Sequence, residues 1–424
     1  MNINSELYAE TAEFTTIDNR TLVKNFGDLP EEYKALREGS TIYDCGSYGL
    51  YSVKGENADA FLERLATKDI GFLNIGSITE CYFLNEEANL VASVFILRRE
   101  DDFIILATWE HADKALKWLQ EKAPEYEVEV EDLSGSHGVL AIEGCKSWKV
   151  VKELFSVEIE NIALHTMQVV DLEERPVTVI RVGRTSEYGY TIISDVETSG
   201  KIYKAFLAMK DNEEKEFPMR ECGLDCLEIA MLEIRQPNFL RETKRFGNLM
   251  ELGQQWFIRY DKEEYIGFEK VREILEAGVE KSTVGFICDA EDEAVLEPGL
   301  EVFIRNIEVE VVVEDEEDND DSFFADDGEA AEPVSEEQVQ EQTQEQAEEP
   351  YIPNEQVEPE KIGEVVYSLY SAKVGKVIGV AVIDQPYAQS GFQMLARRKD
   401  GRDVSVNTFS APIVRPLSWD QKME

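Results

Sequence analysis

One segment of this 424-residue chain cannot form a core of its own, so the folded part must be built from the residues before and after it. Residues 314–360 contain 20 Asp and Glu and no Lys or Arg, within a chain whose net charge is −46. A segment so acidic and so poor in apolar residues cannot bury enough surface to offset the entropy lost on ordering. We therefore expect 314–360 to be disordered, either as a solvated insertion, which we favour, or as an acidic tether that docks a basic partner.

The sequences on both sides of this segment predict β-strands. β-branched residues alternate in LEVFIRNIEVEVVV before it and in KIGEVVYSLYSAKVGKVIGVAVI after it. An insertion at the tip of a hairpin costs little, because loop-closure entropy grows only logarithmically with length. We therefore predict that the C-terminal part of the chain is one β-rich domain that the insertion interrupts.

Upstream, helix and strand patterns alternate in two halves of similar rhythm. The predicted helices are 57–66, 111–122, 147–155 and 200–209, and the predicted strands are 81–84, 91–97, 103–107, 139–142, 177–182 and 190–193. The chain has no GxGxxG or GxxxxGK[ST] motif, so a doubly wound nucleotide fold lacks its usual signature. We predict an α+β chain with antiparallel, ferredoxin-like sheets.

Composition excludes several classes of function. No apolar run approaches the roughly 18–20 residues of a membrane span, and the N-terminus lacks the basic start and apolar stretch of a secretory signal. We therefore expect a cytoplasmic protein without a membrane partner. The net charge of −46 would repel phosphate backbones, which disfavours nucleic-acid binding.

The cysteines and histidines do not form a catalytic or metal-binding motif in the sequence. The chain has six cysteines without CxxC spacing and three histidines, and it has no Gly-x-Ser-x-Gly. Cys222 and Cys226 lie four residues apart on an apolar helical pattern, without the second pair that zinc needs. We expect buried free thiols and no metal site.

Four segments between about 36 and 416 carry the motifs of one known family in the same order. Residues 36–55 contain Tyr-Asp-Cys-Gly-Ser-Tyr-Gly where the family has Phe-Asp-Val-Ser-His-Met-Gly, and 58–108 follow its course from a helix through a Leu-Asn-Glu turn into paired strands. GRTSEYGYTI at 183–192 is similar to Gly-Tyr-Thr-Gly-Glu-x-Gly-Tyr-Glu, and WFIRYDKEEYIGFE at 256–269 to Trp-x-x-x-x-Asp-Lys-x-x-Phe-Ile-Gly-Lys. The chain thus resembles the aminomethyltransferase (T-protein) family of the glycine cleavage system, whose members bind folate.

The resemblance implies a fold and a chemistry. The implied fold is a three-domain cloverleaf around a central hole that holds tetrahydrofolate. Two mixed α/β domains would lie within 1–270, and a C-terminal β-barrel would span 271–420 with the insertion at 314–360. The implied activity is the transfer of an aminomethyl or methyl carbon to tetrahydrofolate. The partners would be folate and a one-carbon donor carrier or a methyltransferase protein.

The resemblance also points to individual residues. Glu187 matches the family's loop glutamate, which binds the pterin edge, and a carboxylate offers two acceptors to the adjacent N–H groups of a pterin. Tyr48 stands where the family has a methionine against the pterin, and Thr108 where it has an asparagine. Ser93 could keep a hydrogen bond at the position of the family's acid. Asp44 matches the first motif, but we interpret it as a cap on backbone N–H groups.

The departures from the family concern its catalytic residues. The family's Asp-Asp aligns with Ala92 and Ser93, and its Arg-Asp-Thr-Leu-Arg-Leu-Glu with 224–230, where both arginines and the last glutamate are replaced. Loss of a positioned acid typically lowers the rate by 10²- to 10⁴-fold. Two hypotheses follow: a tetrahydrofolate-dependent one-carbon transferase, or a non-catalytic folate-binding or assembly protein that recruits a partner through its acidic tether. We leave the catalytic residues unassigned.

Overall fold

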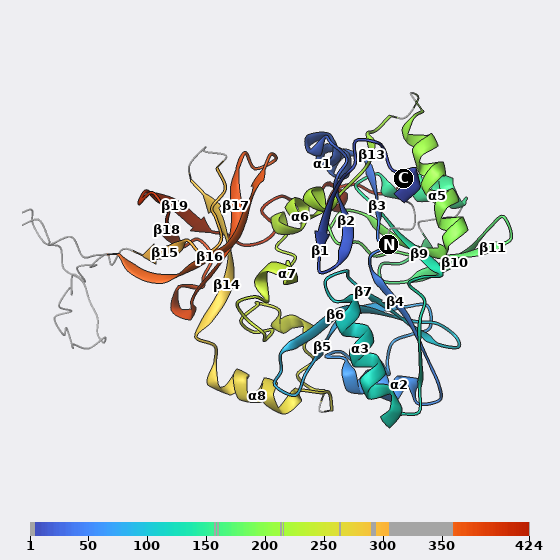
Figure 1. Cartoon of the computed structure of the whole chain (residues 1–424), viewed down its shortest axis with the longest axis horizontal. Helices are drawn as coiled ribbons and strands as arrows, with labels where there is room; N and C mark the ends of the chain where they lie inside the picture. Colours follow the sequence, from blue (N-terminus) through green and yellow to red (C-terminus); the bar gives the residue numbers. More distant parts are fainter. Residues whose placement is uncertain are drawn as a thin grey trace, which may run out of the picture. The chain divides into compact units, whose positions relative to one another are not determined.

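The computed structural model describes residues 5–423, except 157, 159, 160, 213, 215, 263, 290–293 and 305–358 (Figure 1). Of the segment 314–360 that we predict to be disordered, residues 314–358 therefore lie outside the described residues. The same holds for 305–313, the second part of the strand predicted before that segment.

A five-stranded antiparallel sheet in the order β5-β6-β7-β4-β8 forms the first α/β unit (Figure 1). Alternate residues of its strands face opposite ways, as the pleat requires. Val94 and Ile96 pack against helices α2 and α3, while Phe95 and Leu97 face away from those helices. The elements are β4 (Gly49–Lys54), α2 (Ala58–Leu65), β5 (Ile78–Leu84), β6 (Leu90–Arg98), β7 (Phe103–Ala107), α3 (Ala112–Lys122), η2 (Ala123–Glu125) and β8 (Glu129–Asp132).

A six-stranded sheet in the order β10-β11-β12-β9-β3-β13 forms the second unit, and its pair β13–β3 is parallel. Leu140 and Ile192 pack against α4 and α5, whereas Val139 and Ile193 share a core with Phe95 and the other outward residues of the first sheet. The two sheets therefore pack face to face, each with helices on its far side. The elements are β3 (Ser40–Asp44), β9 (His137–Glu143), α4 (Ser147–Phe155), β10 (Met167–Leu172), β11 (Arg175–Ile180), β12 (Gly189–Asp195), α5 (Val196–Lys210) and β13 (Met219–Glu221).

The C-terminal strands close into a barrel in the order β14-β17-β16-β15-β18-β19. β15 and β16, which flank the acidic segment, are neighbours in this barrel, as we predicted for two strands of one hairpin. The strands are β14 (Lys281–Cys288), β15 (Glu301–Ile304), β16 (Glu360–Ser371), β17 (Lys376–Asp384), β18 (Gln393–Arg397) and β19 (Asp403–Thr408).

The remaining elements connect these units. Leu232 of α6 packs against Val366, Ile378 and Val380 of the barrel, so this helix joins the barrel to the sheets. The elements are η1 (Ser5–Leu7), β1 (Glu13–Ile17), β2 (Arg20–Asn25), α1 (Leu29–Glu38), α6 (Leu224–Glu233), α7 (Phe239–Glu242), η4 (Gln255–Phe257), α8 (Phe268–Ala277), η5 (Gln385–Tyr387) and η6 (Leu417–Trp419).

The mixed α/β class and the C-terminal barrel are confirmed, and the boundaries 1–270 and 271–420 stay predictions. All six cysteines lie in the described part of the chain, and each is a buried thiol that forms no disulfide, as expected. Among the helices of that part, none has the length and apolar character to cross a bilayer.

Candidate functional site

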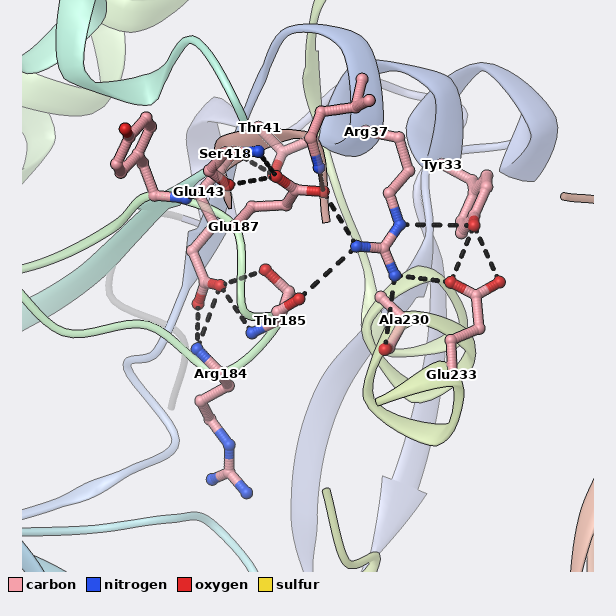
Figure 2. Close-up of polar contacts among 12 residues, drawn as sticks. Tyr33, Arg37, Thr41, Glu143, Arg184, Thr185, Glu187, Ala230, Glu233 and Ser418 are labelled. Carbon is pink, nitrogen blue, oxygen red and sulfur yellow. Dashed lines mark hydrogen bonds and ion pairs between the residues drawn. The ribbon is translucent and has the colours of Figure 1, made fainter. Parts of the chain in front are cut away.

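The loop 183–189 follows β11, includes the first residue of β12, and is fixed by Glu143 at the end of β9. Its carboxylate accepts hydrogen bonds from the backbone N–H of Arg184 and of Thr185, at 3.0 and 3.1 Å, and from the Thr185 hydroxyl at 2.6 Å (Figure 2). Burial raises the pKa of Glu143, although these hydrogen bonds oppose the shift. The loop also needs two glycines, because a Cβ on Gly189 would lie 2.5 Å from the Cα of Gly183.

Glu187 in this loop has both carboxylate oxygens bound by protein donors. Arg37 Nη1 donates to it at 3.0 Å, and the backbone N–H groups of Leu417 and Ser418 donate at 3.2 and 3.0 Å. The Ser418 hydroxyl donates as well (Figure 2). The Glu187 side chain has an exposed fraction of 0%. A ligand would reach this carboxylate only by displacing the C-terminal residues. The role of Glu187 as a pterin ligand stays a prediction.

Arg37 of α1 links Glu187 to the barrel through a second carboxylate, that of Glu233. Its Nη2 donates to Glu233 at 2.5 Å, and Glu233 also accepts from Tyr33 at 2.7 Å (Figure 2). A third donor to Glu233 is the hydroxyl of Ser371 in β16, at 2.6 Å. The Arg37 side chain is only 5% exposed, so this charged network is buried. It ties α1, the loop 183–189, α6 and the barrel together.

Next to the loop lies a small inner cavity of about 30 Å³. Two of its buried polar atoms, Glu110 Oε2 and Arg184 Nε, have no hydrogen-bond partner among the described residues. The same is true of Oγ1 of Thr108, which directly precedes the lining residue Trp109. Figure 2 shows the Arg184 guanidinium pointing away from Glu143 and Glu187. The cavity is lined by Tyr43, Tyr48, Trp109, Glu110, Arg184, Leu224, Leu227, Glu228, Met231 and Asn238.

The structure brings some of the predicted site residues together and separates others. Tyr48 lines the inner cavity, and Thr108 directly precedes its residues Trp109 and Glu110. Ser93 is buried in β6, where its backbone N–H lies 3.3 Å from Nδ1 of His111. Burial, with smaller contributions from Lys114 and Arg184, lowers the pKa of His111 to about 3, so its imidazole is neutral.

Asp44 has the structural role that we expected. Its carboxylate accepts from the backbone N–H of Gly46 at 2.7 Å and from the hydroxyl of Tyr8 at 2.6 Å. It therefore caps the turn between β3 and β4.

Two larger cavities border the loop that follows α6. The outer pocket, of about 320 Å³, is lined by Arg181, Arg184, Ile234 and Gln236 among other residues, so Arg184 lines both it and the inner cavity. A third cavity of about 570 Å³ is lined by Arg235 and by residues of η4, α8 and the barrel. Residues of the loop 234–238 thus line all three cavities, so this loop lies at the centre of the candidate site.

Sequence reasoning missed Glu110 and Arg184 in the cavities and Arg37 and Glu233 in the buried network. Glu110 follows a predicted strand end, a place where functional side chains often gather, and that position was the one available signal. Within the residues that the structure describes, no group of three or more His, Cys, Asp or Glu could hold a metal ion.

Comparisons with known proteins agree with the motifs. Residues 6–262 match the family model described as the GCVT N-terminal domain. An aminomethyltransferase of Thermoanaerobacter sp. is 23% identical over 371 residues, which cover 87% of this chain and 85% of that protein. An aminomethyltransferase of Bacillus pumilus is 25% identical over 281 residues, 65% of this chain and 76% of that protein.

A solved structure shows the same fold over nearly the whole chain. It is the glycine cleavage system aminomethyltransferase T from Bartonella henselae, which matches with a TM-score of 0.72 over 96% of this chain and 95% of that one. At 16% identity this match concerns the fold alone.

Proposed function

Since this chain belongs to the GCVT N-terminal domain family, we propose that it is a tetrahydrofolate-dependent one-carbon transferase related to the glycine cleavage T-protein. The aminomethyltransferase relatives and the shared fold support an activity of the T-protein kind. The proposal adds that tetrahydrofolate is the cofactor and that an aminomethyl or methyl group is transferred to it.

One observation carries the proposal: an acceptor and a donor without partners line the same cavity. Nearly all buried polar groups in proteins are hydrogen-bonded, so Glu110 Oε2 and Arg184 Nε call for a partner from outside the chain. The edge of a pterin has adjacent N–H donors and a carbonyl acceptor, which match a carboxylate and a guanidinium. Tyr48 and Trp109 supply rings for packing against a planar heterocycle.

A pterin fits into the inner cavity only if side chains that line it move. Ligand pockets typically have roughly 300–1,000 Å³, and the inner cavity has about 30 Å³. Arg184 is the side chain that lines both the inner cavity and the outer pocket, and it has an intermediate exposure. We propose that Arg184 moves when the pterin binds, as side chains at binding sites commonly do.

Each site residue then has a stated task. Glu110 would accept from the pterin N–H groups, Arg184 would donate to the carbonyl oxygen, and Tyr48 would exclude water. Ser93 and Thr108 stay in the proposal as hydrogen-bonding positions near the ring. When bound, reduced folate supplies a nucleophilic nitrogen that takes up the carbon. Glu187 would hold the loop 183–189 in place through Arg37 and Ser418.

The alternative function is a non-catalytic folate-binding or assembly protein that recruits a partner through its acidic tether. The observation in its favour is that Ala92 and Ser93, both buried in β6, carry no charge at the place of the family's acid. Replacing 314–358 with a short Gly/Ser linker should then abolish partner capture and leave the melting temperature within about 1 °C. Unchanged partner capture, or one-carbon product formed by the wild type, would count against this alternative.

The test of the transferase proposal is calorimetric titration with tetrahydrofolate under anaerobic conditions. Glu110→Gln should weaken binding by roughly 10-fold or more, because a hydrogen bond to a charged group contributes about 1.5–3 kcal/mol. Glu131→Gln is the control, since Glu131 lies exposed in β8 and pairs with Lys54 at the surface. Equal affinity in Glu110→Gln and wild type would remove Glu110 from the site. The partner carrier and the cytoplasmic location stay predictions.

A further inference from the structure

Glu80 in β5 is a carboxylate on the inner face of the first sheet. In the register of β5 with β6 it lies opposite Phe95, and two residues along, Tyr82 lies opposite Ser93. Directly paired residues of neighbouring strands point to the same face of a sheet. Phe95 faces away from helices α2 and α3, so Glu80 and Ser93 also face away from those helices. Glu80 therefore lies diagonally across from Ser93, on the same face.

The Glu80 carboxylate reaches the centre of the candidate site. It is hydrogen-bonded to the side chain of Gln236, which belongs to the loop 234–238 and lines the outer pocket. It also lies close enough to Arg184 for the two charges to interact, and Arg184 lines both the outer pocket and the inner cavity. Glu80 is partly exposed, so the protein does not enclose it completely.

The two other carboxylates that act on Arg184 already have tasks. Glu143 accepts the hydrogen bonds that fix the loop of Arg184, and Glu110 is assigned to the pterin N–H groups. By contrast, Glu80 accepts from the neutral side-chain amide of Gln236. Of the three acids around Arg184, Glu80 is therefore the one available for chemistry.

The carboxyl of Glu80 also holds a proton more readily than an ordinary glutamate does. Burial raises its pKa above the usual 4.5, and the two cations that act on it, Arg184 and Lys68, oppose this shift without cancelling it. Glu80 in turn adds to the rise in the pKa of Cys81 and Tyr82, which is due mainly to burial. A carboxyl whose pKa lies closer to neutral pH is suited to both releasing and taking up a proton.

We propose that Glu80 is the residue that moves the proton during one-carbon transfer. In such a transfer a bond forms between N5 of reduced folate and the carbon, while the bond from that carbon to the leaving group breaks. The leaving group departs with the electron pair of the broken bond. One proton must then pass from N5 to the leaving group. Glu80 takes up this proton as a carboxylate and gives it to the leaving group as a carboxylic acid.

The position of Arg184 brings Glu80 to the side of N5. In a pterin the carbonyl oxygen and N5 are attached to neighbouring carbon atoms and lie on the same edge of the ring system. The proposed function assigns the carbonyl oxygen to Arg184, so a carboxylate beside Arg184 lies beside N5 as well. The inference about Glu80 rests on this proposed function.

The closing experiment measures proton transfer and binding separately. The probe is formaldehyde, which condenses with tetrahydrofolate and loses its oxygen as water, so its leaving oxygen also needs a proton. We expect the wild type to accelerate this condensation, and Glu80→Gln to lose roughly 10²-fold or more of the acceleration. In anaerobic calorimetry, Glu80→Gln should change the affinity for tetrahydrofolate by less than about 10-fold, because Glu80 does not hold the ring.

Two variants and a second readout make the experiment specific. Glu80→Asp keeps an acid on a shorter side chain and should recover part of the rate, whereas the surface control Glu131→Gln should match the wild type. Melting temperatures check that each variant is folded. Without folate, at pH values just above 4.5, the infrared spectrum of the wild type should contain a protonated-carboxyl band that Glu80→Gln lacks.

Three results would overturn the inference. One is full acceleration of the condensation by Glu80→Gln. Another is no acceleration by a wild type that binds tetrahydrofolate, and the third is a protonated-carboxyl band of equal size in the wild type and Glu80→Gln. A wild type that does not bind tetrahydrofolate would instead refute the proposed function and this inference with it, so the two failures can be told apart.

Discussion

Replacement of Arg37 by methionine should destabilise the protein severely. Arg37 lies between two buried carboxylates, with Glu187 at 3.0 Å and Glu233 at 2.5 Å. Both carboxylate side chains are 0% exposed, so water cannot take the place of the guanidinium. Methionine fills much of the volume but leaves the two acids without their cation.

The magnitude follows from burial. Removing one partner of a buried ion pair typically costs about 3–5 kcal/mol, because a charge remains uncompensated away from water. Arg175 provides a matched control, since it also contacts two carboxylates, Asp195 at 3.0 Å and Glu197 at 2.7 Å, but its side chain is 39% exposed. An exposed pair of this kind contributes about 0–1 kcal/mol.

The assay is urea unfolding of the wild type, Arg37→Met and Arg175→Met, followed by circular dichroism. We expect a loss of about 3–5 kcal/mol for Arg37→Met and of at most about 1 kcal/mol for Arg175→Met. The double variant Arg37→Met/Glu187→Gln should recover part of the loss, because it removes one uncompensated charge. A loss below about 1 kcal/mol for Arg37→Met would refute the reasoning.

Two further predictions concern His111 and Gly189. Because the pKa of His111 is lowered from 6.5 to about 3, its stabilising contribution is complete above pH 6.5 and falls as the pH drops towards 3, by about 2 kcal/mol at pH 5. His111→Gln should therefore lose less stability between pH 7 and pH 5 in urea titrations, and an unchanged pH dependence would contradict the neutral imidazole. Gly189→Ala should cost about 1–3 kcal/mol, since its Cβ would meet Gly183 at 2.5 Å, whereas Gly135→Ala, with no atom within 4 Å of its Cβ, should cost little. Equal melting temperatures for the two alanine variants would show that the loop is not packed as described.

Local periodicity predicted the regular elements well. β7 has the predicted bounds, Phe103–Ala107, and α2 differs from its prediction by one residue at each end. Both patterns depend on neighbours in the sequence, with period 2 for a strand and 3.6 for a helix. By contrast, the three-residue strand β13 was not predicted, because it depends on its pairing with β3, far away in the chain.

The site was predictable only in part, for the same physical reason. Arg37 meets Glu187 and Glu233 across 150 and 196 residues, and no local pattern reports such contacts. The motif at 183–192 correctly marked an important loop, but the sequence could not show that its glutamate is bound to Arg37 and Ser418. Arg184, the residue before Thr185 in the same loop, became a candidate only when its unpartnered Nε was seen.

The measurement that tests the central claim most directly is anaerobic titration of the protein with tetrahydrofolate, beside Glu110→Gln. The account predicts binding to the wild type and a loss of roughly 10-fold or more in the variant, because the unpartnered Glu110 carboxylate oxygen would hold the pterin. The absence of any binding to the wild type, in a protein whose melting curve shows it to be folded, would contradict the account.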